Sequence, residues 1–362
     1  MRILHIMQAA QIGGAERSLL VLLPALRAAG HDVAFLGFAK RLPSGFVDAL
    51  REREIDARVV TGHRLFGPSV ALRIRREIAN YGPDVVHTHL LYGDVQGQLA
   101  SASLRIPAVR TIHGPGNVSS HWKDRIGSRV AGLLARRTIT LSPHAAKFAR
   151  SGRHAPASRI VIVPHGIEPV ADARIARCGS IEPTVICTSR LIEGKGHAVL
   201  IRAMKKVLET HRAHLHIVGT GPLRNDLQQF AADQLPEASF TFSGFSHDVG
   251  AALAASDIFV LPTGRSLGEG SPVAVLEAMA AGLPIVASDL PALRDLFGST
   301  EAGVLVEPGD PDALAAAIVN LLDAPNRRAA LGLRGRQLTH ERYSVEQLVE
   351  QTVGVYKSVL NR

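Results

Sequence analysis

Cysteine is scarce in this chain, and its scarcity narrows the kinds of site the protein can contain. The 362 residues include two cysteines, Cys178 and Cys187, with no CxxC spacing. A disulfide framework and a cysteine-based metal site are therefore excluded, and a reducing compartment is expected. We interpret both residues as ordinary core or surface thiols, and we predict no metal.

Long hydrophobic runs are also missing. No apolar stretch approaches the length of a membrane-spanning helix. The chain begins with a strand-like run at 3–7 and lacks the basic region and cleavage site of a signal peptide. We therefore expect a cytoplasmic protein that does not cross a membrane, although it can lie peripherally at the inner face of the cell membrane.

Acidic residues are sparse in the first half of the chain. Residues 1–170 hold 23 Lys/Arg against 11 Asp/Glu, a net +12, whereas the remainder holds 18 against 21, a net −3. This imbalance suggests an anionic partner for the first half, either nucleic acid or an acidic membrane. Aromatic residues make up 4% of the chain, and no nucleic-acid-binding motif is visible, so we expect no nucleic-acid partner.

Short apolar runs alternate with amphipathic stretches along the whole chain. In the first half, strands are predicted at 3–7, 32–38, 57–60, 85–88, 108–112 and 137–141, with helices at 14–29, 46–53, 71–80 and 93–103. The apolar run 160–163 then leads to a turn-forming break at 164–166. In the second half, strands are predicted at 184–188, 214–218, 240–242, 258–261, 284–287 and 304–306, with helices at 197–209, 223–232, 249–255, 273–281, 311–323, 327–340 and 344–360. This alternation is typical of parallel sheets covered by helices on both faces.

The alternation restarts once, which predicts two facing Rossmann-like domains with a cleft between them. We place the first domain at 1–168, a linker at 169–182, and the second domain at 183–343. The final helix, 344–362, is expected to pack back on the first domain. Ligands of such sheets bind at the carboxyl ends of the strands.

Two glutamates bracket the start of a predicted helix. Glu269 precedes Gly270, Ser271 and Pro272, and Glu277 lies about one turn inside the helix that begins near Val273. A helix N-terminus suits a phosphate, and a carboxylate one turn further can accept two hydrogen bonds from a ribose diol. Taken alone, the two residues are better explained as a capping and a solvated glutamate.

Two cations follow the predicted strand 184–188. Arg190 and Lys195 lie five residues apart across the turn SRLIEGKG at 189–196, so they can converge on a diphosphate. Each alone is better explained as a solvated surface charge. Gly219, in the VGTGP turn at 218–222, adds weak support as a donor-binding residue.

In the first half, candidate ligand contacts lie in glycine-rich turns that follow strands. Gly14, in GGAE at 13–16, allows close approach of an anion or sugar. His113 follows the strand 108–112, where a role in the site and a structural role are about equally expected. His87 and His89 have a spacing that suits a metal, but no third ligand is apparent, so we favour a structural role.

Together these motifs resemble the retaining glycosyltransferases of family four, which have the GT-B fold. The resemblance covers essentially the whole chain: GGAE at 13–16, TIHG at 111–114, PHGIE at 164–168, SRLIEGKG at 189–196, VGTGP at 218–222, SDIFVLPT at 256–263 and EGSPVAVLEAMAAGLPIVASD at 269–289. The last is the most specific motif. The resemblance implies transfer of a hexosyl unit from a UDP-sugar or GDP-sugar to a carbohydrate or lipid-linked acceptor, in cell-envelope glycan or glycolipid synthesis.

The resemblance also implies roles for individual residues. Arg190 and Lys195 would hold the diphosphate, Glu277 the ribose, and Glu269 the donor sugar. Main-chain groups of Gly270, Ser271 and Val273 would bind phosphate or sugar, Phe245 would flank the base, Gly14 would lie near the phosphates, and His113 would approach the sugar. Many members have Phe-Gly where this chain has Ser271-Pro272, so one N–H donor is absent. Arg190 and Lys195 would take the place of a divalent metal, so no cofactor is expected. The resemblance to retaining enzymes also implies that the anomeric configuration of the sugar is retained.

Other interpretations stay open at this point. A non-enzymatic nucleotide-sugar-binding module, an epimerase or a phosphorylase could share this fold. Between 122 and 137, apolar residues at helical spacing alternate with Lys123, Arg125, Arg129, Arg136 and Arg137. Such a helix could lie on an anionic membrane that presents a lipid-linked acceptor, or it could simply pack on the sheet.

Overall fold

The computed structural model divides the chain into two compact units. Unit 1 consists of Met1–Gly166 with Val345–Arg362, and unit 2 of Ile167–Ser344. The structure describes residues 1–8, 13–39, 45–62, 67–114, 121–169, 182–246, 249–266 and 272–361.

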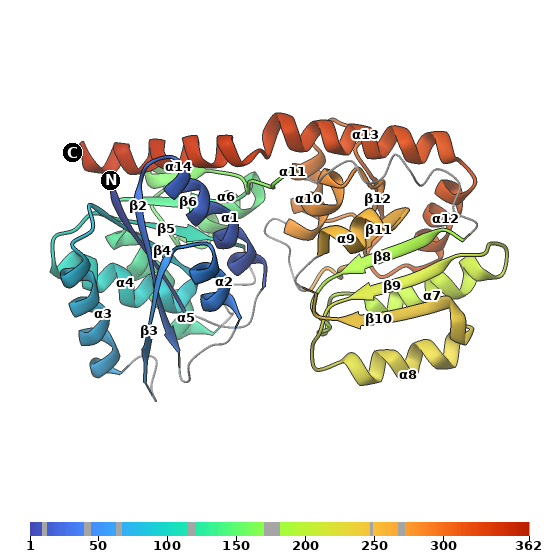
Figure 1. Cartoon of the computed structure of the whole chain (residues 1–362), viewed down its shortest axis with the longest axis horizontal. Coiled ribbons are helices and arrows are strands. Elements are labelled where there is room, and N and C mark those ends of the chain that lie inside the picture. Colours follow the sequence, from blue (N-terminus) through green and yellow to red (C-terminus); the bar gives the residue numbers. More distant parts are fainter. Residues whose placement is uncertain are drawn as a thin grey trace. The chain divides into compact units, whose positions relative to one another are not determined.

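Unit 1 is built on a seven-stranded parallel sheet with the order β3-β2-β1-β4-β5-β6-β7 (Figure 1). Its strands are β1 Arg2–Gln8, β2 Asp32–Ala39, β3 Asp56–Thr61, β4 Val85–His89, β5 Ala108–Ile112, β6 Arg137–Thr140 and β7 Ile160–Ile162. Its helices are α1 Gly14–Ala28, α2 Phe46–Glu52, α3 Pro68–Tyr81, α4 Leu90–Ser103, α5 Trp122–Leu134, α6 Pro143–Ser151 and α14 Val345–Leu360, with a short 3-10 turn at Ala157–Arg159.

The sheet of unit 1 has a hydrophobic core on each face. Leucines of α1, Phe46 of α2 and Tyr356 of α14 pack with Ile3 and Met7 of β1 on one face. The helices α3 and α4 cover the other face, where Ile74 packs against the opposite set of strand residues. Because neighbouring side chains of a strand alternate between faces, strands such as β1, β2 and β4 contribute to both cores.

Unit 2 is built on a six-stranded parallel sheet with the order β10-β9-β8-β11-β12-β13 (Figure 1). Its strands are β8 Thr184–Thr188, β9 His214–Val218, β10 Phe240–Gly244, β11 Ile258–Leu261, β12 Ile285–Ser288 and β13 Val304–Val306. Its helices are α7 His197–Leu208, α8 Arg224–Gln234, α9 Val249–Ala254, α10 Val273–Ala280, α11 Pro291–Phe297, α12 Pro311–Leu322 and α13 Pro325–Arg342, with a 3-10 turn at Glu237–Ser239.

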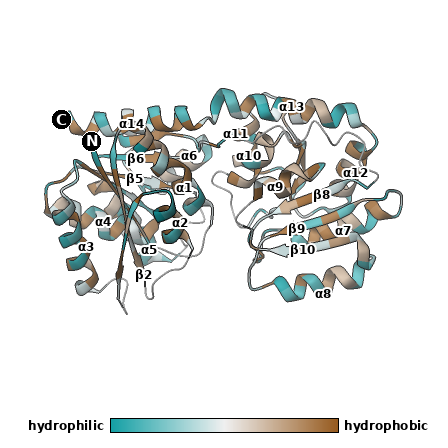
Figure 2. Cartoon of the chain, in the orientation of Figure 1, coloured by the Kyte–Doolittle hydropathy of each residue, from teal (hydrophilic) through white to brown (hydrophobic). Residues whose placement is uncertain are grey.

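Local sequence explains where these elements begin and end. Asp310 caps α12, because its side chain accepts from the backbone N–H groups of Asp312 and Ala313 at 2.8 and 3.0 Å. Gly82 ends α3 in the left-handed conformation, with φ of 62°. The buried strands are hydrophobic and the outer helices are mixed, as Figure 2 shows.

The predicted parallel sheets covered by helices are confirmed, and most element boundaries agree within one or two residues. Two helices were not predicted, α6 and α11. Pro272 is the N-cap of α10, directly before Val273, where the helix was predicted to begin. The predicted linker lies almost entirely outside the described residues.

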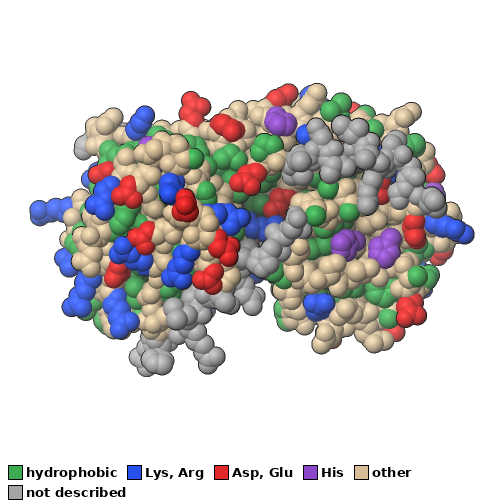
Figure 3. Space-filling view, viewed as in Figure 1, with side chains coloured by type: hydrophobic (Ala, Val, Ile, Leu, Met, Phe, Trp, Pro, Cys, Tyr) green, Lys and Arg blue, Asp and Glu red, His purple; other side chains and the backbone are tan. Residues whose placement is uncertain are grey.

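The surface and the helices add two observations. In the part of the chain that the structure describes, no helix is long and apolar enough to cross a membrane. On the face shown in Figure 3, basic side chains over unit 1 are interspersed with acidic ones. The excess positive charge of the first half therefore forms no single uninterrupted patch on that face.

Candidate functional site

Each sheet has one point at which its strand order reverses. In unit 1, β1 lies between β2 and β4, and in unit 2, β8 lies between β9 and β11. Consecutive connections leave such a strand on opposite faces, which opens a crevice at its carboxyl end. The residues that follow β1, β4, β8 and β11 are therefore the first places to look for a ligand site.

The loop after β8 carries the two predicted cations. Arg190 is exposed and Lys195 is partly buried. Backbone hydrogen bonds fix this loop to its neighbours, since the Ser189 N–H donates to the Val218 carbonyl at 3.1 Å and the Gly264 N–H donates to the Gly194 carbonyl at 2.8 Å. The loop therefore holds both cations at the switch point of unit 2.

Two polar side chains that the sequence analysis did not single out lie beside these cations. The Ser189 hydroxyl and His197 Nε2 are 2.9 Å apart. Burial lowers the pKa of His197 to about 4, and the positive charge of Lys195 adds to this effect. His197 is therefore neutral near pH 7, and Lys195 supplies the charge. The sequence offers one signal for His197, because this histidine begins a predicted helix directly after the glycine-rich turn at 189–196.

The glycines of this edge allow close packing of loops. A Cβ on Gly219 would lie 1.9 Å from the Ser189 carbonyl oxygen, and one on Gly196 would lie 1.8 Å from that of Pro262. Gly196 also has φ of +78°, a conformation that disfavours other residues. Gly219, predicted as a donor-binding residue, thus has a packing role that explains its identity without a ligand.

Helix α10 contains part of the predicted donor site. Val273 is its first residue, and Glu277 lies partly buried one turn further. Such a helix start has unpaired N–H groups and a positive dipole end. Glu269, Gly270 and Ser271 lie outside the described residues, so their predicted roles stay predictions.

Three further predicted residues lie in loops or at a helix start. Phe245 follows β10 and has 42% of its surface exposed. Gly14 is the exposed first residue of α1, where the Glu16 carboxylate accepts from the Gly13 N–H at 3.0 Å. His113 follows β5 and is partly buried. His113 and Gly14 belong to unit 1, whereas the cations, Phe245 and Glu277 belong to unit 2.

His113 is joined to a row of buried histidines. Its Nε2 lies 3.2 Å from His89 Nδ1, and its Nδ1 is buried without a hydrogen-bond partner among the described residues. Burial lowers the pKa of His113 to about 3, and nearby His165 contributes to the shift. His113 is therefore a neutral imidazole. Its Nε2 is hydrogen-bonded to His89, which leaves Nδ1 as the nitrogen that can meet a ligand.

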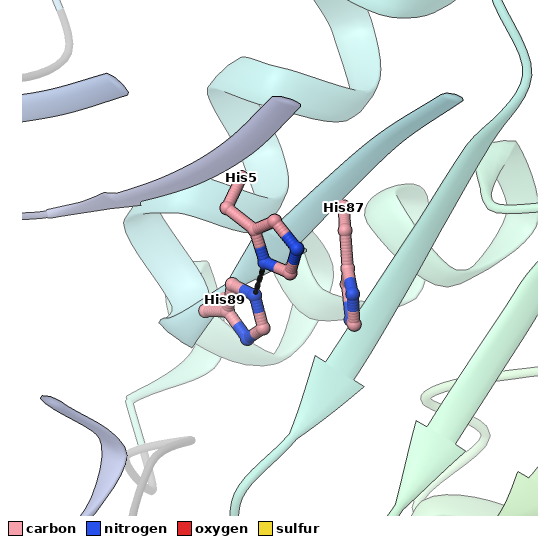
Figure 4. A group of neighbouring side chains, drawn as sticks. All are labelled: His5, His87 and His89. Carbon is pink, nitrogen blue, oxygen red and sulfur yellow. Dashed lines mark hydrogen bonds between the residues drawn. The ribbon is translucent and has the colours of Figure 1, made fainter. Parts of the chain in front are cut away.

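The structure supplies the third imidazole that the sequence analysis did not find beside His87 and His89. It is His5 of β1, which pairs with His87 in the sheet register. Figure 4 shows the three rings together, and their nitrogens lie within 4.8 Å of one another. The sequence did not reveal His5 as the third imidazole because β1 and β4 are neighbours in the sheet although some 80 residues separate them in the chain.

A group of this size can be considered as a metal site. However, both ring nitrogens of all three histidines already lie within hydrogen-bond distance of a described side chain. We therefore interpret the cluster as a hydrogen-bond network within the core of unit 1.

A buried ion pair on the opposite face of the sheet holds α4 and α5. An Arg110 Nη lies 2.8 Å from the Asp94 carboxylate, and Arg110 also donates to the Ser128 carbonyl of α5 at 2.6 Å. Burial raises the pKa of Asp94, and the charge of Arg110 opposes this rise. The buried residues of α5 are the small ones Ser128, Ala131 and Gly132. No larger residue fits at the last of these, because a Cβ on Gly132 would lie 1.8 Å from the His154 carbonyl oxygen.

The outer face of α5 is apolar. Trp122 and Leu133 have 62% and 66% of their surfaces exposed, and Ile126, Val130 and Leu134 are exposed as well. These apolar residues therefore do not pack on the sheet, whereas Ser128, Ala131 and Gly132 on the other side of α5 are buried.

Comparisons with known proteins match most of the chain. Residues 12–170 match the model of Glycosyltransferase Family 4, and residues 182–324 match that of Glycosyl transferases group 1. A phosphatidyl-myo-inositol mannosyltransferase of Mycobacterium leprae is 30% identical over 96% of this chain and 93% of its own. A GDP-mannose-dependent alpha-(1-6)-phosphatidylinositol monomannoside mannosyltransferase of Mycobacterium tuberculosis is 29% identical over 75% of each chain.

A solved structure supports the fold. Alr3699/HepE of Anabaena, crystallised in complex with UDP, superimposes with a TM-score of 0.84 and 21% identity, covering 99% of this chain and 100% of its own. At that identity the likeness shows the fold of two Rossmann-like domains.

Proposed function

Because the chain belongs to the family 4, group 1 glycosyltransferases and is a hexosyltransferase, we propose that its donor is a nucleoside-diphosphate sugar held by unit 2. The observation that carries the proposal is the pair Arg190 and Lys195 at the carboxyl end of β8, where the strand order reverses. Arginine offers a fork of N–H donors and lysine a point charge, and both suit a diphosphate.

The rest of the nucleotide is assigned to neighbouring elements. The N-terminus of α10 at Val273 adds a positive dipole end for a phosphate, and Glu277, one turn further, accepts from the ribose hydroxyls. Phe245 provides an exposed ring for the base. Glu269 contacts the donor sugar, and Gly270 and Ser271 contribute main-chain groups.

The chemistry follows from charge. Breaking the anomeric bond leaves negative charge on the diphosphate, which Arg190, Lys195 and the α10 dipole stabilise electrostatically. The acceptor hydroxyl attacks the face from which the nucleotide leaves, and a donor phosphate oxygen takes its proton, so the configuration is retained. No divalent metal or other cofactor takes part.

The test begins with a thermal-shift screen of GDP-mannose, UDP-glucose and related donors. The best donor is then assayed for hydrolysis and transfer, with and without a chelator. We expect Arg190→Ala and Lys195→Ala to lower turnover by roughly 100-fold or more. Full turnover in either variant, an inverted product, or loss of activity on chelation contradicts the corresponding part of the proposal. A donor that binds without turning over would favour a non-enzymatic binding module.

We further propose that the acceptor is lipid-linked and is reached at an anionic membrane surface through α5. The helix exposes Trp122 and Leu133 on its outer face, alongside Lys123, Arg125 and Arg129. Apolar side chains that enter the headgroup region beside cations that attract anionic lipid are the features of an interfacial helix.

Liposome sedimentation tests this acceptor proposal. We expect binding to vesicles that contain anionic phospholipid, weaker binding to neutral vesicles, and loss of binding in the double variant Trp122→Ser, Leu133→Ser. The matched control is Leu333→Ser, an equally exposed leucine, at 62%, on α13 of unit 2. Equal and negligible binding to both kinds of vesicle would indicate a soluble acceptor.

A further inference from the structure

The donor chemistry leaves the buried histidine network of unit 1 without a function. The network runs from Tyr356 of α14 through His5 and His89 to His113. The distances are 3.4 Å from the Tyr356 hydroxyl to His5 Nε2, 2.9 Å from His5 Nδ1 to His89 Nε2, and 3.2 Å from His89 Nδ1 to His113 Nε2.

A branch of the network begins at the same tyrosine. The Tyr356 hydroxyl lies 2.7 Å from His87 Nδ1, and His87 Nε2 lies 2.7 Å from the Thr111 hydroxyl. The rings of His5, His87 and His89 are almost completely inaccessible to solvent. The one ring nitrogen of the network without a partner among the described residues is His113 Nδ1.

Burial keeps these imidazoles neutral. It lowers the pKa of His5 and His113 to about 3 and moves the pKa values of His87 and His89 well below their ordinary range. A neutral imidazole has one N–H donor and one acceptor nitrogen. The nitrogen that carries the proton in one ring therefore fixes which nitrogen carries it in the next. The whole network has two proton arrangements, and both contain the same number of protons.

In the first arrangement, the Tyr356 hydroxyl donates to His87, and His87 Nε2–H donates to Thr111. His5 Nε2–H then donates to the tyrosine oxygen, His89 Nε2–H to His5, and His113 Nε2–H to His89, which leaves His113 Nδ1 as a bare acceptor. In the second arrangement every bond is reversed, and His113 Nδ1 carries the proton.

Two features of the structure favour the first arrangement. A phenol is a better donor than acceptor, and the Tyr356 hydroxyl is much closer to His87, at 2.7 Å, than to His5, at 3.4 Å. In addition, His113 Nδ1 is buried and unpartnered, and a buried acceptor without a partner occurs more readily than a buried N–H without one.

We propose that Tyr356, His87, His5 and His89 are positioning residues that hold His113 as its Nε2–H tautomer, so that Nδ1 accepts a hydrogen bond from a hydroxyl of the sugar substrate. The role of His113 toward the substrate rests on the proposed function, whereas the control of its tautomer does not. Tyr356 acts through the network and touches no substrate.

The decisive variant is Tyr356→Phe, which removes one hydroxyl and keeps the ring. Without that oxygen, the first arrangement leaves His5 Nε2–H as a buried donor with no partner, and the second leaves His113 Nδ1–H as one. Each arrangement then holds one unpartnered N–H, so the preference for the first is lost and we expect a mixture of both tautomers at His113. Imidazole nitrogen NMR of the full chain measures this mixture directly, with the His113 resonances assigned by their loss in His113→Gln.

A second variant tests the network from its other end. Thr111→Val removes the acceptor of His87 Nε2–H, so the first arrangement again holds an unpartnered N–H, and we expect a similar mixture of His113 tautomers. The matched control is Tyr343→Phe, because Tyr343 is a buried tyrosine of unit 2 whose hydroxyl donates to the Leu296 carbonyl at 3.2 Å. We expect no change at His113 in this control.

The outcomes separate this inference from the proposed function. An unchanged His113 tautomer in a folded Tyr356→Phe protein, or an Nδ1–H tautomer in the unmodified protein, overturns the inference whatever the activity. Appearance of the Nδ1–H tautomer at His113 in Tyr356→Phe supports it, with turnover lowered in proportion to the share of that tautomer, because that share has lost one substrate hydrogen bond. If the Nδ1–H tautomer appears and turnover stays the same, the network stands and the assignment of His113 to the site fails.

Discussion

The residues at the carboxyl ends of the strands differ in charge between the two units. In unit 2, the loop after β8 presents Arg190 and Lys195 among glycines that allow tight loop packing. In unit 1, the ends of β4 and β5 present imidazoles that burial keeps neutral. A charged edge suits the diphosphate of a donor, whereas a neutral, hydrogen-bonded edge suits hydroxyl groups. Under the proposed function, the charge that holds the diphosphate and the imidazole that orients the sugar would come from separate halves of the chain.

The largest difference between the units should appear on acidification. His5, His87, His89, His113 and His165 of unit 1 have pKa values lowered by burial, as does His197 of unit 2. Below about pH 6.5 the unfolded chain takes up protons that the folded state does not. Stability therefore falls as the pH falls, by about 1.4 kcal/mol per pH unit for each such histidine, until its folded pKa is reached, which is about 3 for His5 and His113 and about 4 for His165 and His197.

Hydrogen exchange with mass spectrometry between pH 7 and 4.5 measures this effect for each unit in the full chain. We expect the strands of unit 1 to lose protection at higher pH than those of unit 2. In His165→Gln the pH dependence of unit 1 should become shallower by one histidine. Simultaneous loss of protection in both units would contradict the comparison.

The second difference concerns glycines with the same backbone conformation. Gly30 of unit 1 and Gly196 of unit 2 have φ of +84° and +78°, but a Cβ on Gly30 would meet nothing within 4 Å. Gly30→Ala should cost only the left-handed strain, about 1–2 kcal/mol. Gly196→Ala must also displace the Pro262 carbonyl, so we expect on the order of 3–5 kcal/mol. Urea unfolding of both variants provides the comparison, and equal losses would show that the loop packing adjusts easily.

The smallest difference expected is in nucleotide affinity. Arg190→Gln and Lys195→Gln should each weaken binding of GDP or UDP by roughly tenfold to 100-fold, since each removes a charge-assisted contact worth about 1.5–3 kcal/mol. His113→Gln removes no charge and should change affinity by less than about threefold. Titration calorimetry with the free nucleotide measures all three. A loss in His113→Gln as large as in the cation variants would remove the division of roles between the units.

Much of the fold could be predicted because the strands are short apolar runs between glycine and proline turns. The predicted strands 108–112, 184–188, 214–218 and 304–306 agree with β5, β8, β9 and β13. The helices α6 and α11 were missed because they are short, although Ser142 before Pro143, and Pro291, are start signals.

The site could be predicted only in part. Arg190, Lys195 and Glu277 follow local patterns that a single segment reveals. The hydrogen-bonded connection between His5 and His113 depends on the strand order β1-β4-β5 and on the pairing of His5 with His87. No single segment of the sequence reveals either of these. Tyr356 lies still further from local reasoning, because it reaches the histidines from the last helix.

The return of α14 to unit 1 has a consequence for how the chain is made. Unit 2 is continuous and complete once Ser344 has been synthesised, whereas the core of unit 1 still lacks Tyr356 and its neighbours on α14. During translation, the second half can therefore reach its native packing while the first half still waits for its closing segment. The hydrogen-bond network that includes Tyr356 and His87 can therefore form only after α14 has been synthesised.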